Sequence, residues 1–419
     1  MRAVLRLAKS LALDIEPLRV SRDFRLLWSG LFISELGYQF SLVAIFVQIY
    51  QLTGSPAAVG LTGLFSFLAL LLGAVISGAV LDAYDRRKLL MWAQVGFAFA
   101  SCLLLAGAIN GDPPLWQIYL AASIFAMVST IDGPTRSAMT PRLVGDALVP
   151  SALALNQVVW NGVGLLGPAL GGIVIARLGF SWAYGIDLVT YGAMFIAAFR
   201  IAPMPPTREA GEAPAVGWPA VKEGFAFVRK SKLLQSTFVI DLIAMIFGLP
   251  RALFPILAVT QFHRGPEVVG LLFAAPAAGA LVGALTGGWV RHVNRQGVAV
   301  IWAVAGWGAA IVAFGLVGPH LGLAMFFLAL AGAADVISAI FRSTILQVSA
   351  PEELRGRLSG IHILVVTGGP RLGDLEAGMV AQVWSPTVSV VSGGLICIAG
   401  AGAVALAYPV LRRYRQRPR

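Results

Sequence analysis

The sequence predicts an all-α membrane protein with twelve transmembrane helices in two pseudo-symmetric six-helix bundles. Three observations support this fold class. The chain of 419 residues is 58% hydrophobic and 12% charged, with a mean hydropathy of +0.81. About a dozen apolar stretches fill nearly all of it, and one longer polar segment divides them six and six. Short sequences also recur at matching places in the two halves.

Each apolar stretch is long enough to cross a bilayer, because a helix of roughly 20 apolar residues spans the hydrocarbon core and satisfies its own backbone. We predict spans at 27–50, 57–81, 89–109, 116–139, 153–176, 182–200, 233–260, 267–290, 298–317, 321–346, 358–383 and 387–410. The polar connection is rich in proline and includes APMPPTREAGEAP. The predicted parts are therefore an N-terminal segment 1–23, a bundle 24–200, a linker 201–232, a second bundle 233–410 and a basic tail 411–419.

Lysine and arginine residues gather in alternate connections, which predicts the orientation of the chain. Arg86, Arg87 and Lys88 follow the second predicted span, and the chain ends in RRYRQRPR. We therefore expect both termini in the cytoplasm and the protein in the plasma (inner) membrane. The basic residues that give the net charge of +11 flank the spans, so we expect no nucleic-acid partner. Residues 1–23 are expected to form a basic helix on the inner membrane surface rather than a signal peptide.

The sequence lacks the usual signatures of an enzyme or an ATP-driven pump. It contains no G-x-x-x-x-G-K-[ST] phosphate loop, and its four histidines are scattered without the spacing of metal ligands. Cys102 and Cys397 lie inside predicted spans, which argues against a disulfide framework. We expect no enzymatic activity, no cofactor and no metal.

Internal repeats indicate that the two bundles are related. VGL at 59–61 recurs at 269–271, Arg136-Ser137 recurs as Arg342-Ser343, and GPALG at 167–171 recurs as GPRLG at 369–373. Duplicated halves that rock around a site near the membrane midplane are a transporter design. The repeats therefore favour a transport function.

The connection at 78–88, GAVLDAYDRRK, resembles the signature loop of the major facilitator superfamily. The resemblance implies a gating motif in which Gly78 packs closely and Asp82 latches onto Arg86 or a neighbouring helix N-terminus. Arg86 and Arg87 hold the loop in the cytoplasm. Ala83 and Asp85 depart from the family pattern, and His292 replaces the acid in the second half, so we expect an asymmetric latch.

The fifth predicted span contains GVGLLGPALGG at 162–172, which resembles the Gly-Pro motif of exporters in this superfamily. Pro168 removes one helical hydrogen bond and favours a kink. The resemblance implies an efflux-biased hinge at Gly167, Pro168, Gly171 and Gly172. An ordinary kinked helix is the alternative interpretation.

In the second half, RALFPILA at 251–258, GLLFAAPAAGALVGALTGG at 270–288 and ELRGRLSGI at 353–361 resemble the enterobactin exporter group of the superfamily. The resemblance implies a monomeric antiporter, surrounded by lipid, that exports a small molecule by alternating access. The implied substrate is a catecholate siderophore and the implied energy source is the proton gradient. A multidrug or macrolide efflux pump is the alternative. A non-transporting sensor or scaffold is disfavoured, because the chain has no sizeable soluble domain and carries charges within its spans.

Ionisable residues inside spans cost about 2.5–3.5 kcal/mol each on insertion scales, so we treat them as functional candidates. The proton-coupling candidates are Glu35, Asp132, Asp335, Asp374 and Glu376. The superfamily resemblance places spans 1, 4, 7 and 10 around the cavity, and the substrate-cavity candidates are Tyr38, Gln39, Arg136, Arg251 and Arg371.

Helical spacing predicts two local ion pairs among these residues. Asp132 and Arg136 are four residues apart, and Arg371 and Asp374 are three apart. Glu35 and Glu376 have no cation nearby in the sequence. For each of these two, structural hydrogen bonding and proton coupling both remain open.

Overall fold

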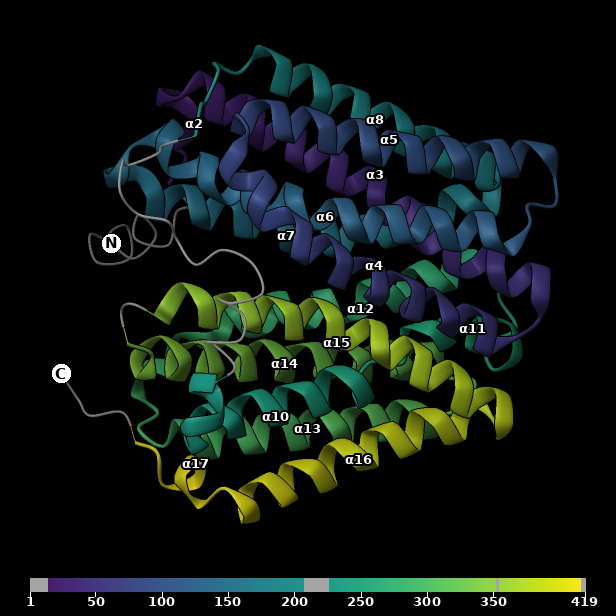
Figure 1. Cartoon of the computed structure of the whole chain (residues 1–419). Coiled ribbons are helices and arrows are strands. Elements are labelled where there is room, and N and C mark those ends of the chain that lie inside the picture. Colours follow the sequence, from purple (N-terminus) through teal and green to yellow (C-terminus); the bar gives the residue numbers. More distant parts are fainter. Residues whose placement is uncertain (1–13, 207–225, 352–353, 416–419) are drawn as a thin grey trace, which may run out of the picture.

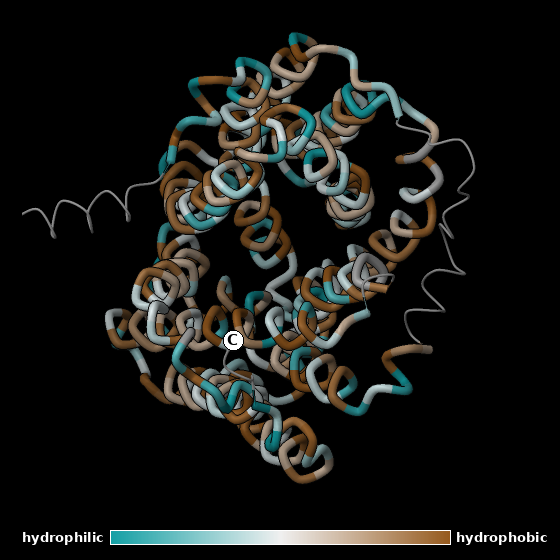
Figure 2. Tube along the Cα trace, turned by 90° about the vertical axis from the view of Figure 1, so that its left-hand side faces the viewer, coloured by the Kyte–Doolittle hydropathy of each residue, from teal (hydrophilic) through white to brown (hydrophobic). Residues whose placement is uncertain are grey.

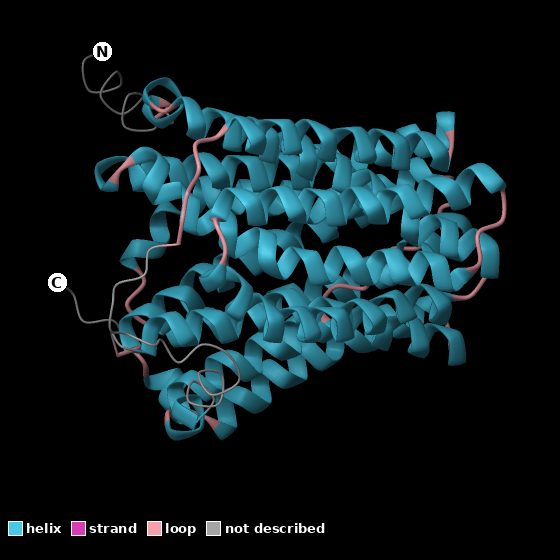
Figure 3. Ribbon diagram, turned by 45° about the horizontal axis from the view of Figure 1, so that its top comes forward, coloured by secondary structure: helices cyan, strands magenta, loops and turns pink. Residues whose placement is uncertain are grey.

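In the computed structural model, the described residues are 14–206, 226–351 and 354–415, and they fold into helices joined by short loops (Figures 1 and 3). The first half contains α2 (Glu16–Val20), α3 (Arg22–Thr53), α4 (Pro56–Ala83), α5 (Arg86–Asn110), α6 (Leu115–Val144), η1 (Asp146–Leu148), α7 (Val149–Leu178) and α8 (Phe180–Arg200). The second half contains α10 (Lys232–Phe247), η2 (Arg251–Leu253), α11 (Phe254–Thr260), α12 (Pro266–Thr286), η3 (Gly287–His292), α13 (Gln296–Leu316), α14 (Leu321–Ser349), α15 (Arg355–Val383), α16 (Pro386–Ala407) and α17 (Pro409–Arg413).

The described helices confirm an all-α membrane protein. Eleven of them are long and apolar enough to cross a membrane. The remaining long helix, α15, has 29 residues and runs alongside the others, but Arg371, Asp374 and Glu376 make it more polar (Figure 1). Ten of the predicted spans each lie on one of these helices, with end points that differ by a few residues, whereas span 233–260 covers α10, η2 and α11 and span 267–290 runs from α12 into η3. The predicted surface helix over 1–23 lies mostly outside the described residues.

The seventh predicted span, 233–260, is interrupted rather than continuous. α10 ends at Phe247, and the turn η2 precedes α11. Pro250 has no N–H and disfavours the helical conformation at the residue before it, which explains the break. The indole N–H of Trp307 donates to the Gly248 carbonyl oxygen at 2.7 Å and so satisfies a backbone group at the break. This interruption places Arg251 at the start of the short 3-10 helix η2 rather than within an α-helix.

Serine caps mark the starts of several helices. The hydroxyls of Ser21, Ser55, Ser231 and Ser385 each accept a hydrogen bond from a backbone N–H in the first turn that follows. Asp85 does the same at the start of α5, where it accepts from two backbone N–H groups. These caps satisfy donors that a helix leaves free at its N-terminus.

The helices form two groups that meet along two pairs of helices. α3 to α8 pack together, as do α10 to α16, and the groups join where α4 lies along α15 and α7 lies along α12 (Figure 1). α2 and α17 lie at the same end of the molecule, which we call the terminal face. Figure 2 looks onto that face and shows apolar segments in brown throughout the helices, and many large apolar side chains, among them Leu72, Phe99 and Trp302, are exposed, as expected in lipid.

Glycines bring both helix pairs into backbone contact at the end away from the terminal face. A Cβ on Gly60 of α4 would lie 2.6 Å from the Asp374 carbonyl oxygen and 3.1 Å from Cα of Gly378 on α15. A Cβ on Gly172 of α7 would lie 3.0 Å from Cα of Gly270 on α12. Gly60 and Gly270 are the central residues of the repeated VGL triplets. The two crossings therefore close the same face of the molecule.

Replacing Gly60 by leucine is expected to separate the two halves at this face, because backbone atoms of α15 occupy the space that the side chain needs. Nitroxide labels on Leu52 and Trp384, with both native cysteines replaced by alanine, report the separation by pulsed electron resonance. The label distance should lengthen by several ångströms. The control is Gly192→Leu, where a Cβ meets nothing within 4 Å. An unchanged distance in the Gly60 variant would contradict the closing role.

Candidate substrate cavity

Two adjoining cavities lie between the halves of the molecule, with volumes of about 200 Å³ and 360 Å³. They share the lining residues Tyr38 of α3, Phe125 of α6, Trp160 of α7 and Arg371 of α15. The larger volume is within the range of about 300–1,000 Å³ that is typical of small-molecule sites. The shared residues come from both halves, so a bound molecule would contact both.

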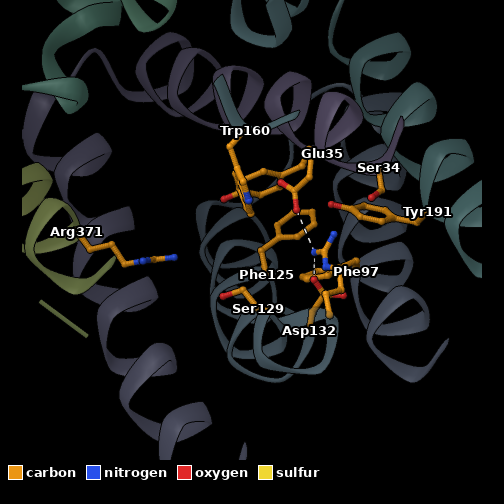
Figure 4. A pocket seen from close by; sticks show the side chains of 12 residues that line it. Ser34, Glu35, Phe97, Phe125, Ser129, Asp132, Trp160, Tyr191 and Arg371 are labelled. Atoms are coloured by element: carbon orange, nitrogen blue, oxygen red, sulfur yellow. Dashed lines mark hydrogen bonds and ion pairs between the residues drawn. The ribbon is translucent and has the colours of Figure 1, made fainter. Parts of the chain in front are cut away.

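Three charged side chains form a buried triad on one wall of the smaller cavity (Figure 4). The Arg136 guanidinium lies 3.0 Å from Oε1 of Glu35 and also contacts the Asp132 carboxylate. Gln94 donates from Nε2 to Asp132 at 3.0 Å. The predicted pair of Asp132 and Arg136 is therefore present, and Glu35 joins it from another helix. Two carboxylates share one guanidinium, so the ionised triad carries one net negative charge.

Aromatic rings make up much of the remaining wall. Tyr38 meets Phe125 edge-on with ring centroids 5.5 Å apart, and Phe97 stacks on Tyr191 at 5.2 Å. In Figure 4, Arg371 reaches in from one side, across from the charged triad, and Trp160 projects from above, beside Glu35. Rings of this kind offer stacking and edge contacts to an aromatic ligand.

Arg371 provides a cationic group to the cavity, and Asp374 acts on it electrostatically without a direct ion pair. Its guanidinium donates to the Thr367 carbonyl oxygen one turn earlier, and in the described part of the chain it forms no ion pair. The predicted pairing of Arg371 with Asp374 is wrong. Asp374 instead accepts from Arg251 at 2.8 Å, because the break in the seventh span brings that arginine against α15. The positive charge of Arg371 thus remains available to the cavity.

All five cavity candidates line the two cavities, as do three of the five coupling candidates. Arg136 lines the smaller cavity, Gln39 and Arg251 line the larger one, and Tyr38 and Arg371 line both. The three acids are Glu35, Asp132 and Asp374. Glu376 and Asp335 line neither cavity. Glu376 is two residues beyond Asp374, which turns it roughly 200° around the helix, away from the cavity.

A second buried charge cluster lies in the other half of the molecule. The Arg342 guanidinium lies 3.0 Å from Asp241 and 3.6 Å from Asp335, and it donates to the Ser338 hydroxyl at 3.0 Å. Nδ1 of His362 lies 3.6 Å from the second oxygen of Asp241. The positions of Asp241 and Arg342 are each 206 residues beyond those of Glu35 and Arg136 (241 − 35 and 342 − 136). The carboxylate–arginine pair is therefore duplicated along with the bundle.

The proposed gating loop is attached to the end of α8. Arg86 contacts the Leu81 carbonyl oxygen with its guanidinium, and Arg87 donates to the Phe199 carbonyl oxygen at 2.6 Å. Asp85 accepts from the Met204 N–H at 2.8 Å. Gly78 lies near the end of α4, and the side chain of Asp82 lies outside the described residues. The predicted latch of Asp82 therefore stays a prediction.

The glycines of the proposed hinge pack α7 against its neighbours on two sides. A Cβ on Gly167 would lie 2.6 Å from Cβ of Gln39, and one on Gly171 would lie 3.0 Å from Cα of Phe40, both on α3. Gly172 faces α12 instead. Pro168 lies inside α7 between these contacts. The motif therefore lies where α7 contacts both its own half and the opposite half.

Several residues of the site escaped sequence reasoning, namely Gln94, Phe97, Phe125, Tyr191 and His362. Aromatic and amide residues are common in apolar spans, so the four in the first half carry no distinctive signal. The second cluster did have a signal. Arg342 lies as many positions beyond Arg136 as Asp241 lies beyond Glu35. Applying the offset of the repeated arginine to Glu35 would therefore have located the pair of Asp241 and Arg342.

Comparison with known protein families identifies the chain. The family model of the transmembrane secretion effectors, a branch of the major facilitator superfamily, matches residues 13–416. The chain belongs to this family. It is therefore a multi-pass secondary transporter of a small molecule rather than an enzyme. The resemblance to the superfamily is confirmed.

This secretion effector is similar over its full length to known exporters. It is 29% identical to the enterobactin exporter EntS of Citrobacter koseri over 411 residues, which cover 98% of this chain and 97% of the relative. It is 27% identical to EntS of Shigella boydii over 410 residues, with the same coverage. Its fold is similar to a POT family transporter solved with 5-aminolevulinic acid, with a TM-score of 0.74 at 10% identity, covering 93% of this chain and 97% of that one. The nucleoside transporter NupG has a TM-score of 0.73 at 12% identity, covering 93% and 100%.

Proposed function

We propose that this secretion effector is a proton-coupled exporter of an anionic, aromatic small molecule, and that the molecule is a catecholate-type siderophore. The observation that carries the proposal is the position of Arg371, an arginine that forms no ion pair among the described residues, in a cavity walled by aromatic rings. An arginine in an apolar cavity favours a ligand that brings negative charge. Similarity to the enterobactin exporters supports the same substrate class.

The triad of Glu35, Arg136 and Asp132 supports proton coupling. Its ionised form carries one net negative charge, and a proton on Glu35 makes the triad neutral. In that form Arg136 forms an ion pair with Asp132 alone, because protonated Glu35 carries no charge. Glu35 is 13% exposed and lines the cavity, so both a proton and a substrate can reach it.

In this proposal the protein lies in the inner membrane, and its terminal face points into the cytoplasm. The charge distribution supports it, because arginine and lysine are concentrated at the ends of the spans on that side. The glycine crossings close the opposite face. In this orientation the closed face is the outer one, as expected for an exporter that receives its substrate from the cytoplasm.

A multidrug or macrolide efflux pump is the second candidate function. The apolar part of the cavity lining favours it, because Phe97, Phe125 and Trp160 also suit a neutral hydrophobic compound. Deletion of the gene in its native host distinguishes between the two candidate functions. We expect less secreted catecholate siderophore and unchanged drug susceptibility. Unchanged siderophore secretion with increased macrolide susceptibility would support the second function and overturn the first.

Arg371→Gln is expected to weaken the binding of enterobactin by roughly 10- to 100-fold, the usual range for losing a hydrogen bond to a charged group. Binding of a neutral macrolide should change by less than about threefold, since it brings no charge for Arg371 to neutralise. Calorimetric titration of the purified protein measures both ligands. Arg177→Gln, an exposed arginine at the end of α7, is the matched control. Equal losses for both ligands would contradict a charge-recognising role.

A further inference from the structure

A basic cavity lies outside the transport path, where the inner ends of α13 and α16 meet α17. Its volume is about 610 Å³. Four arginines line it together with Val298, Ile301, Trp302 and Ala405, and these arginines are Arg295, Arg412, Arg413 and Arg415. α17 follows α16 at the terminal face and lies at the outer edge of the second half (Figure 1). The cavity thus lies at the membrane boundary rather than between the halves.

A close approach of two backbones shapes this cavity. A Cβ on Gly297 would overlap the Leu411 carbonyl oxygen, so only glycine lets α17 pack against the first turn of α13. Leu411 is fully buried at this contact. α17 is thereby held against α13, and its arginines lie across from Arg295. The site is part of the fold rather than a freely moving tail.

The charges of the cavity are uncompensated. None of its lining residues is acidic, and among the described residues none of the four arginines forms an ion pair. Four guanidinium groups around one cavity repel one another unless an anion lies between them. Guanidinium groups bind phosphate oxygens through paired hydrogen bonds, so the favoured ligand group is a phosphate.

The apolar side of the cavity distinguishes a lipid from a soluble anion. Trp302 is 73% exposed beside the arginines, and Leu406, next to Ala405 on α16, is 76% exposed. Tryptophan is enriched at the level of lipid headgroups, where one part of its ring is in contact with acyl chains. Basic pockets between transmembrane helices on the cytoplasmic side are typical binding sites for anionic headgroups.

We propose that the cavity between α13, α16 and α17 binds the headgroup of an anionic phospholipid. The phosphate lies among Arg295, Arg412 and Arg413, and the glycerol and the upper acyl chains lie against Trp302 and Ile301. The ligand attaches the end of the second half to the inner leaflet. This site is independent of the substrate cavity.

Native mass spectrometry of the purified full-length protein with phosphatidylglycerol tests this proposal. Arg412→Gln/Arg413→Gln is expected to lower the affinity for the first bound phosphatidylglycerol about thirtyfold, as two arginine–phosphate attractions near a membrane surface predict. The control Arg19→Gln/Arg200→Gln removes the same charge from exposed arginines of the first half and should change the affinity less than about twofold. Both arginines of the test variant are exposed, so the variant is expected to fold.

Two further measurements complete the test, namely binding of phosphatidylcholine and competition by inorganic phosphate. Phosphatidylcholine should lose clearly less affinity than phosphatidylglycerol in the Arg412→Gln/Arg413→Gln variant, because its choline cation offsets the charge of its phosphate. Excess inorganic phosphate should not displace bound phosphatidylglycerol, because it lacks the acyl chains that contact Trp302. Equal losses in the two double variants, or full displacement by inorganic phosphate, would overturn the proposal.

Discussion

Glu35→Gln is expected to abolish the dependence of transport on the pH gradient while leaving substrate binding measurable. Glu35 shares Arg136 with Asp132, and a glutamine keeps the hydrogen bond to that arginine without being able to take up or release a proton. Each proton returned down a gradient of one pH unit can support about a tenfold accumulation of substrate. In proteoliposomes of the variant, the accumulation ratio should fall to about one whatever the gradient.

Glu376→Gln is the matched comparison, because it removes a carboxyl group of the same kind from another span. Glu376 does not line either cavity, and in the described part of the chain it forms no ion pair. We expect this variant to keep most of its gradient-driven accumulation. Loss of coupling in Glu376→Gln together with wild-type coupling in Glu35→Gln would show that the proton carrier lies outside the cavity and would contradict the role of the triad.

Arg342→Gln is expected to lower the free energy of unfolding by about 3–5 kcal/mol, the usual cost of removing one partner from a buried ion pair. Asp241 is 1% exposed and would be left with His362 as its nearest titratable neighbour. The loss should be largest at neutral pH, since protonation of an isolated buried carboxylate at lower pH relieves part of the cost. Unfolding in mixed micelles with increasing dodecyl sulfate measures the change.

Replacing both partners distinguishes the ion pair from a simple packing defect. The double variant Asp241→Asn/Arg342→Gln should recover at least half of the stability that Arg342→Gln loses, because the fully buried carboxylate is gone and only the partly exposed Asp335 is left without its arginine. Arg177→Gln, at an exposed position, should change the free energy of unfolding by less than about 0.5 kcal/mol. Additive losses in the double variant would contradict an energetic coupling between Asp241 and Arg342.

The span positions could be predicted from the sequence because lipid imposes one strong requirement on every helix. A transmembrane helix must satisfy its own backbone and present apolar side chains, so the positions of α3 and α13 are evident from hydropathy, with basic residues marking their first ends. The break in the seventh span was missed, although Pro250 was its signal. A proline in an apolar stretch is compatible with a kink or with a full interruption, and the contact of Trp307 with Gly248 decides between them.

The candidate site was only partly predictable because sequence spacing reports neighbours on one helix and not between helices. Asp132 and Arg136 were found as a pair because they lie one turn apart. Arg371 and Asp374 have equally favourable spacing, yet Asp374 pairs with Arg251, which is 123 positions away. The third member of the triad, Glu35, is 101 positions from Arg136. Such partners depend on the way helices pack, and one sequence gives that information only where a duplication repeats it.

Uphill transport in vesicles tests the central claim most directly. The unmodified protein is reconstituted so that the terminal face points outward, iron-free enterobactin is added outside, and the vesicle interior is made acidic. We predict accumulation of enterobactin inside against its concentration gradient, and its complete loss when a protonophore dissipates the pH gradient. Accumulation that persists without the gradient, or its absence in gradient-bearing vesicles whose protein binds enterobactin, would contradict a proton-coupled exporter.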